Sequence, residues 1–304
     1  MKEYFKNSKK GELTTQQIVL LIILLVGFIV VLYFLFRLDL GKESDMEVCH
    51  NSVIMRGSSV VPTDAIPLKC SRSYICITKD GSCEKMTKPE IKKVKTEEEI
   101  YEVLAEEMAN CWWMFGEGRV NYVGKDFKEN LYCSICSQIA FDDSLEEIEG
   151  VGEEISQEKF YSFLEKKQMQ EGGQSYLYYL TGYPDMNSFQ NYVSASGIGF
   201  RELELNKQYF ILTGITSEVG VWKWAGFGAA GLGLLAAPFT GGASLGISAL
   251  IIGGSATAGG IGGYFVGTAV KGEGVNNEFL KPIIIEASSD VFSKFNCKDV
   301  LTTA

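Results

Sequence analysis

The chain has 304 residues, a formal net charge of -10 and eight cysteines, and 46% of its residues are hydrophobic. This length allows one sizeable domain together with membrane segments. The first eleven residues carry four lysines and one acid, a charge of +3, so the rest of the chain carries -13 (-10 minus +3). An acidic body repels nucleic acid, so we expect no nucleic-acid partner.

Residues 18–36 contain no charged side chain. As a helix this run would be about 28 Å long, close to the thickness of a bilayer's hydrocarbon layer. Four lysines precede it, and positive charge resists translocation, which favours a cytoplasmic N-terminus and an extracytoplasmic bulk. We therefore predict a cell-membrane protein with a cytoplasmic segment over 1–17, a transmembrane helix over 18–36 and a linker over 37–46. A cleaved secretory signal is the alternative, but this run is long and lacks a small-residue cleavage site.

The motif Lys9-Lys10-Gly11-Glu12-Leu13 ahead of the apolar run resembles the class III signal of archaeal type IV pilin-like proteins. The resemblance implies cleavage after Gly11. It departs from the pilin pattern at Gln16, the fifth residue counted from Glu12, where pilins usually carry Glu. This departure bears on processing at Gly11 as well as on filament assembly, so neither is carried over with the signal alone.

All cysteines follow the apolar run, on its predicted outer side: Cys49, Cys70, Cys76, Cys83, Cys111, Cys133, Cys136 and Cys297. An even number in an oxidising compartment favours disulfides. Their connectivity is not derivable, because eight cysteines allow roughly a hundred pairings.

Cys133 and Cys136, separated by two residues, have two further interpretations. A zinc site would need two more ligands, drawn from distant cysteines or from His50, the only histidine. A thiol-disulfide enzyme would place the pair at a helix N-terminus after a strand, and the residues before it are too few to establish that context. We assign no metal, cofactor or catalytic residue.

Residues 47–220 have the pattern of a mixed α and β domain. Thr96 and Glu99 form a capping box, apolar residues follow at helical spacing to Trp112, and Gly116 and Gly118 end the helix. A second helix is predicted over 157–167. Strands are predicted over 51–56 and 209–212, and a hairpin is predicted over 73–85 around Asp80-Gly81.

The acidic run over residues 142–158 contains eight acids and no base. It offers oxygen ligands to calcium, but its spacing is not that of an EF-hand, and such runs are usually solvated surface.

Two segments combine aromatic residues with cysteine: Cys111-Trp112-Trp113-Met114-Phe115 and Tyr132-Cys133-Ser134-Ile135-Cys136. The first fits a helix end packed in the core beside a disulfide, with a ligand-stacking platform as the alternative. Together they resemble uncharacterised, N-terminally anchored membrane proteins of small-genome archaea. The resemblance brings no activity with it.

Residues 225–270 contain fourteen glycines and no charge. We predict a glycine-rich membrane-associated helical hairpin over 221–271 that spans, re-enters or lies on the bilayer, followed by an extracytoplasmic tail over 272–304. Gly259, Gly263 and Gly267 would lie along one stripe for helix packing or oligomerisation.

The predicted fold class is a disulfide-braced α+β extracytoplasmic domain with an N-terminal transmembrane helix and a C-terminal glycine-rich hydrophobic helical hairpin. The leading function is a cell-envelope protein of structural or interaction type, whose partners are the lipid bilayer, copies of itself or another envelope protein. The alternatives are a pore-forming or fusion-type protein acting through the hairpin, and a thiol-disulfide enzyme using Cys133 and Cys136.

Overall fold

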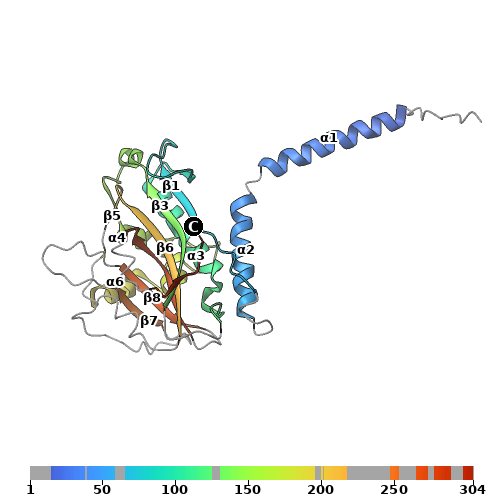
Figure 1. Cartoon of the computed structure of the whole chain (residues 1–304). Helices are drawn as coiled ribbons and strands as arrows, with labels where there is room; N and C mark the ends of the chain where they lie inside the picture. Colours follow the sequence, from blue (N-terminus) through green and yellow to red (C-terminus); the bar gives the residue numbers. More distant parts are fainter. Residues whose placement is uncertain are drawn as a thin grey trace, which may run out of the picture. The chain divides into compact units, whose positions relative to one another are not determined.

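The computed structural model, shown in Figure 1, divides the chain into two units, residues 1–44 and 45–304. The described residues are 15–37, 40–58, 66–124, 131–195, 200, 202–217, 247–252, 265–272, 277–288 and 297–303.

The first unit contains helix α1 (Thr15–Arg37), which includes the predicted span. Among the described residues, it is the one helix long and apolar enough to cross a membrane, over Gln16–Tyr33, and none of that window is buried. The helix predicted over residues 18–36 is therefore confirmed as part of α1.

Helix α2 (Leu40–Gly57) leads into the second unit, and it corrects two expectations. Residues 51–56 are helical instead of forming a strand, and part of the predicted linker is helical too. Cys49 and Val53 are buried one turn apart, so the buried face follows the helical period. Six residues are too few for a hydrophobic pattern to separate strand from helix.

One mixed sheet organises the second unit, in the strand order β2-β1-β3-β6-β9-β8-β7, with β10 beside β3. The pairs of β1 with β2, β1 with β3 and β10 with β3 are parallel, and the others are antiparallel. The bounds are β1 (Ser73–Thr78), β2 (Glu90–Lys93), β3 (Leu131–Phe141), β6 (Gln208–Ser217), β7 (Ile247–Ile252), β8 (Phe265–Lys271), β9 (Asn277–Glu286) and β10 (Asp299–Val300). A separate small sheet pairs β4 (Glu154–Ser156) with β5 (Glu202–Glu204).

The predicted hairpin over 73–85 is wrong, although its turn residues do bend the chain. Gly81 has a φ of 99°, which glycine adopts readily, and the Asp80 carboxylate accepts a hydrogen bond from the Ser82 amide. The chain then continues to β2, which lies parallel to β1. A two-residue turn signal fixes a bend, whereas the pairing of the next strand depends on the whole sheet.

Helices α3 (Glu97–Met114), α4 (Gln157–Lys166), α5 (Tyr176–Thr181) and α6 (Met186–Ala195) complete the α+β domain. The predicted helix start is confirmed, since the Thr96 side chain caps α3 by accepting a hydrogen bond from the Glu99 amide. Its predicted end at the glycines is confirmed as well, because Gly116 and Gly118 both have positive φ. The predicted second helix is α4, and the predicted strand over 209–212 lies within β6.

Hydrophobic residues lie on both faces of the sheet. The larger core contains the buried side chains of α3, α4 and α5. The smaller one contains Leu131, Cys133 and Ile135 of β3 together with residues of β6 and β9, and Cys297 packs against it. The segment predicted as a tail, 272–304, therefore belongs to the domain, because β9 lies in the sheet between β6 and β8.

The glycine-rich segment is described only at β7 and within β8, and there it forms strands and not helices. β7 pairs with β8, and β8 pairs with β9. The residues of these strands are rich in Ile, Val, Phe and Thr, which favour extended backbone. The remainder of the predicted hairpin lies outside the described residues.

Candidate functional site

All eight cysteines are joined in four disulfides. Cys49 bonds to Cys70, Cys76 to Cys83, Cys111 to Cys136, and Cys133 to Cys297, with Cα–Cα distances of 4.5, 6.4, 5.5 and 5.7 Å respectively. The disulfide bracing predicted from the cysteine count is therefore confirmed. The bonds attach α2, α3 and the C-terminal segment to the rest of the domain.

The two cysteines proposed as a dithiol pair do not bond to one another. Cys136 belongs to the larger core, where it bonds to Cys111 of α3, and Cys133 belongs to the smaller one. Odd spacing along a strand points side chains to opposite faces. The thiol-disulfide interpretation of this pair is therefore wrong for the described arrangement.

His50, considered above as a zinc ligand, stacks on Trp113 with a ring-centroid distance of 4.1 Å. Its Nδ1 lies 2.7 Å from the Trp113 carbonyl oxygen. These contacts join α2 to the end of α3. Within the described ranges, no group of three or more His, Cys, Asp or Glu residues is arranged to hold a metal ion.

Several carboxylates of the acidic run over 142–158 form ion pairs or cap a helix. Asp143 pairs with Lys85, and Glu147 pairs with Lys79. Asp142 caps the short helix η3 (Asp143–Glu147) by accepting a hydrogen bond from the Ser144 amide. These contacts are structural, and they divide the carboxylates between separate partners.

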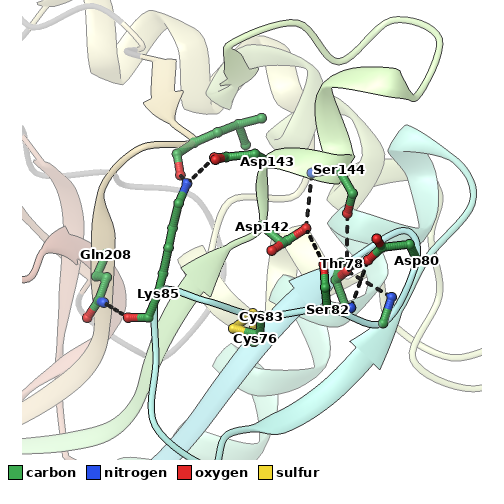
Figure 2. The surroundings of a disulfide bond; sticks show 12 residues. Cys76, Thr78, Asp80, Ser82, Cys83, Lys85, Asp142, Asp143, Ser144 and Gln208 are labelled. Carbon is green, nitrogen blue, oxygen red and sulfur yellow. Dashed lines mark hydrogen bonds and ion pairs between the residues drawn. A yellow bond between two sulfur atoms is a disulfide. The ribbon is translucent and has the colours of Figure 1, made fainter.

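A polar network gathers where the parallel strands β1 and β3 end (Figure 2). The Asp80 carboxylate accepts hydrogen bonds from the hydroxyls of Thr78 and Ser82, at 3.0 and 2.7 Å. The Ser82 hydroxyl also lies 3.2 Å from an oxygen of Asp142, and Ser144 lies 3.1 Å from Thr78. The side-chain and backbone hydrogen bonds from Ser82 are the main cause that lowers the pKa of Asp80 to about 2. The network holds the loop closed by Cys76–Cys83 against β3.

The strongest candidate site centres on Lys281, a lysine within the apolar strand β9. Only 8% of its surface is exposed. Its ammonium donates a hydrogen bond to the Tyr179 carbonyl oxygen at 2.6 Å and lies 5.6 Å from the centre of a Trp112 ring. Burial lowers the pKa of Lys281 to about 8, and the Glu117 carboxylate partly opposes that shift. A buried amine with such a pKa is a candidate functional group.

A β-bulge sets the direction of Lys281. Leu212 pairs with Ile283, but Gly214 pairs with Leu280, so Lys281 and Pro282 together oppose the single residue Thr213. Proline lacks the amide hydrogen that a regular ladder needs and is tolerated at bulges. Bulges of this kind redirect a side chain, and they are frequent beside functional sites.

Glu117 lies near Lys281 and has an uncommon backbone conformation. Its φ is 54°, and it is flanked by Gly116 and Gly118, which also have positive φ. Its carboxylate accepts a hydrogen bond from the Tyr179 hydroxyl at 2.7 Å and pairs with Arg119 at 3.2 Å. Burial and this carboxylate both raise the pKa of the Tyr179 hydroxyl. Strained residues of this kind are often found at functional sites.

Sequence reasoning missed this site. The available signal was a single charged residue followed by proline inside the run Phe279-Leu280-Lys281-Pro282-Ile283, which is otherwise apolar. The contacts of Lys281 with α3 and α5 join residues more than a hundred positions apart, and no local pattern reveals them. Trp112 itself was singled out, and it lies both in the core and against Lys281.

The glycine sites are only partly described. Gly267 lies in β8, opposite Leu250 of β7. The stripe of three glycines predicted for helix packing stays a prediction, because Gly267 alone of the three lies within the described residues. Gly259 and Gly263, and the processing site at Gly11, lie outside the described residues.

Comparison of the chain with protein-family models, with curated proteins and with solved structures finds no match.

Proposed function

We propose that this chain is a membrane-anchored cell-envelope protein of structural or interaction type, with its α+β domain outside the cytoplasm. The observation that carries the proposal is the pairing of all eight cysteines in four disulfides. Disulfides of this kind persist in oxidising compartments and are rare in a reducing cytosol.

The anchor supports the same location. Helix α1 has the length and composition of a span, and lysines precede it. Positive charge on the N-terminal side favours a cytoplasmic N-terminus, so the chain after α1 would lie on the opposite side. All eight cysteines follow α1, in agreement with that orientation.

The bilayer is the first partner in this proposal, and a second copy or another envelope protein is the other. The glycine-rich segment 221–271 is the proposed packing element, in whatever geometry its remaining residues adopt. The relation to membrane proteins of small-genome archaea and cleavage after Gly11 are parts of the same proposal.

Topology mapping in intact cells tests the location. A membrane-impermeant maleimide should not label the protein before reduction, and it should label Cys297, the partly exposed member of its pair, after treatment with an impermeant reductant. A Ser8→Cys variant supplies the control, because its new thiol should react only after the membrane is permeabilised. Labelling of the native cysteines without reduction, or only after permeabilisation, would contradict the proposal.

Carbonate extraction tests the anchor. The full chain should stay in the membrane pellet, because α1 would be embedded in lipid. Residues 45–304, which form a compact unit, should be released when expressed in the same compartment without the first unit. Retention of this truncated chain would assign bilayer contact to the domain itself, with 221–271 as the first segment to examine.

A further inference from the structure

The C-terminal residues cover part of one edge of β3. Strand β6 pairs with β3 on one side, over residues 131–140. On the other side, β1 pairs with residues 137–141 and β10 pairs with residues 132–133. The first half of this edge is therefore covered by the C-terminal strap, which we define as residues 297–303.

Main-chain hydrogen bonds attach the strap to β3. The Lys298 amide donates a hydrogen bond to the Leu131 carbonyl oxygen at 2.8 Å. The Leu301 amide donates to the Cys133 carbonyl oxygen at 2.9 Å. A strand edge that offers such groups is a template for an extended chain. The strap therefore occupies the place that an added strand would take.

The end of the strap bonds to a second segment of the domain. The Thr303 amide donates a hydrogen bond to the Cys70 carbonyl oxygen, and the Thr303 carbonyl oxygen accepts one from the Arg72 amide, both at 2.9 Å. Cys70 is in turn bonded to Cys49 of α2. The strap thus connects β3 with the segment between α2 and β1.

The strap buries little of its own surface. Within it, Thr302 is the one buried residue, and its hydroxyl accepts a hydrogen bond from the Ile135 amide at 3.1 Å. Its exposed residues are Lys298, Asp299 and Thr303. Ordering a chain end costs conformational entropy, which a short and exposed segment recovers poorly. The disulfide at the first residue of the strap is therefore its main restraint.

This disulfide can be reached from one side. Cys133 is 0% exposed, whereas its partner Cys297 is half-buried. Attack on a disulfide needs access to one of its sulfurs. A thiol would therefore approach the bond from Cys297, in the strap itself.

We propose that this edge of β3 is an exchangeable strand-acceptor site, filled by the chain's own strap while Cys133–Cys297 is intact and by the strap of a second copy after reduction and reoxidation. The strap of a second copy brings the same amides, the same side chains and the same cysteine that the site already receives. Exchange of an identical element between copies is a low-cost route to dimers. A second copy is a partner that the proposed function names, but this surface is separate from 221–271, and purified protein tests it whatever its location.

A small-molecule thiol drives the exchange. Its thiolate attacks the Cys297 sulfur, the S–S bond breaks, and the electron pair passes to the Cys133 sulfur, which takes a proton. A second thiol then displaces Cys297 from the mixed disulfide, so two thiols become one small disulfide. The reverse reaction, with a small disulfide as the oxidant, joins Cys133 of one copy to Cys297 of the other.

Limited reduction of the purified full-length protein tests the release of the strap. The protein is treated with reduced glutathione under native conditions and then with iodoacetamide, and mass spectrometry locates the alkylated cysteines. Cys133 should become alkylated together with Cys297, because departure of the strap uncovers it.

The pair Cys76–Cys83 is the matched control in the same sample. It also joins a buried cysteine to a half-buried one, but it closes a loop within the chain. Cys76 should therefore stay protected when Cys83 is alkylated. Protection of Cys133 when Cys297 is alkylated, or equal alkylation of Cys76 and Cys133, would overturn the proposal.

Two complementary full-length variants test the second copy. Cys133→Ser keeps a strap with Cys297, and Cys297→Ser keeps a β3 edge with Cys133, so neither can close the bond alone. Mixed and oxidised with glutathione disulfide, they should form a Cys133–Cys297 heterodimer several-fold in excess of the homodimers of either variant.

A substitution in the strap separates strand pairing from random oxidation. Leu301→Pro removes the amide that donates to β3 and should lower the heterodimer yield several-fold, whereas Leu301→Ala keeps that amide and should lower the yield less. A heterodimer yield no higher than that of the homodimers, or one that Leu301→Pro leaves unchanged, would refute exchange between copies.

Discussion

Cys133 and Cys136 lie three positions apart on β3, and each forms a disulfide with a different partner on opposite faces of the sheet. Cys133 reaches Cys297, 164 residues away, and Cys136 reaches Cys111, 25 residues away. A bulge at Cys136 shifts the register of β3 against β6. Beyond it, Ile139 and Phe141 continue the larger core. One short motif therefore anchors both layers that cover the sheet.

The long-range disulfide should contribute more stability than the short one. In the chain-entropy account, closing the 164-residue separation of Cys133–Cys297 is worth about 5 kcal/mol, and closing the seven-residue separation of Cys76–Cys83 about 2 kcal/mol. Urea unfolding of the paired Cys→Ser variants measures the difference. Equal losses for the two pairs would contradict the entropic ranking.

Glycine should suit position 117 better than alanine. Both Glu117→Gly and Glu117→Ala remove the hydrogen bond with Tyr179, but only alanine retains the cost of the positive φ. The free energy of unfolding of the glycine variant should be about 0.5–1 kcal/mol higher than that of the alanine variant. At Glu106, exposed in the middle of α3, the order should reverse, because glycine is the poorer helix former. The same order at both positions would contradict the strain at Glu117.

The Asp80 network should lose its stabilising effect in acid. The pKa of Asp80 in the folded chain is about 2, below the value of about 3.9 in an unfolded chain. The carboxylate therefore stabilises the fold above about pH 4, and the effect is lost as the pH falls toward 2. Unfolding free energies of the native protein and of Asp80→Asn, measured from pH 5 to 2, should converge in acid. A difference that does not change with pH would show that the charge is not responsible.

A methyl group at Gly57 should weaken the attachment of α2 to the domain. A Cβ there would lie 2.6 Å from the Cβ of Val120, which is too close for two carbon atoms. Gly57→Ala should destabilise the domain by about 1–3 kcal/mol in thermal or chemical unfolding. Gly152→Ala is the matched control, because nothing lies within 4 Å of a Cβ built there. If both variants cost the same, α2 is not packed against Val120 in solution.

Local features could be predicted from the sequence because neighbouring residues produce them. The apolar run before Arg37, the Thr96 cap and the glycines that end α3 act over one or two turns of helix. The even number of cysteines beyond the apolar run indicated disulfides for a different reason, since composition and compartment are properties of the chain as a whole.

Local patterns misled where they were short. Residues 51–56 were predicted as a strand and form part of α2, because six residues are too few to separate the two patterns, and the burial of Cys49 and Val53 follows the helical period. The Asp80-Gly81 turn was real, but its hairpin was not, because β1 has a parallel neighbour on each side.

The sequence by itself determined the apolar helix, the α+β class and the disulfide-rich composition, because each follows from composition or from contacts along a few turns. Only the tertiary structure decided which cysteines pair, that residues 277–286 lie within the sheet, and that Lys281 meets Trp112 and Tyr179. Those relationships join distant parts of the chain, and a folded sheet with a bulge at Lys281 is what brings them together.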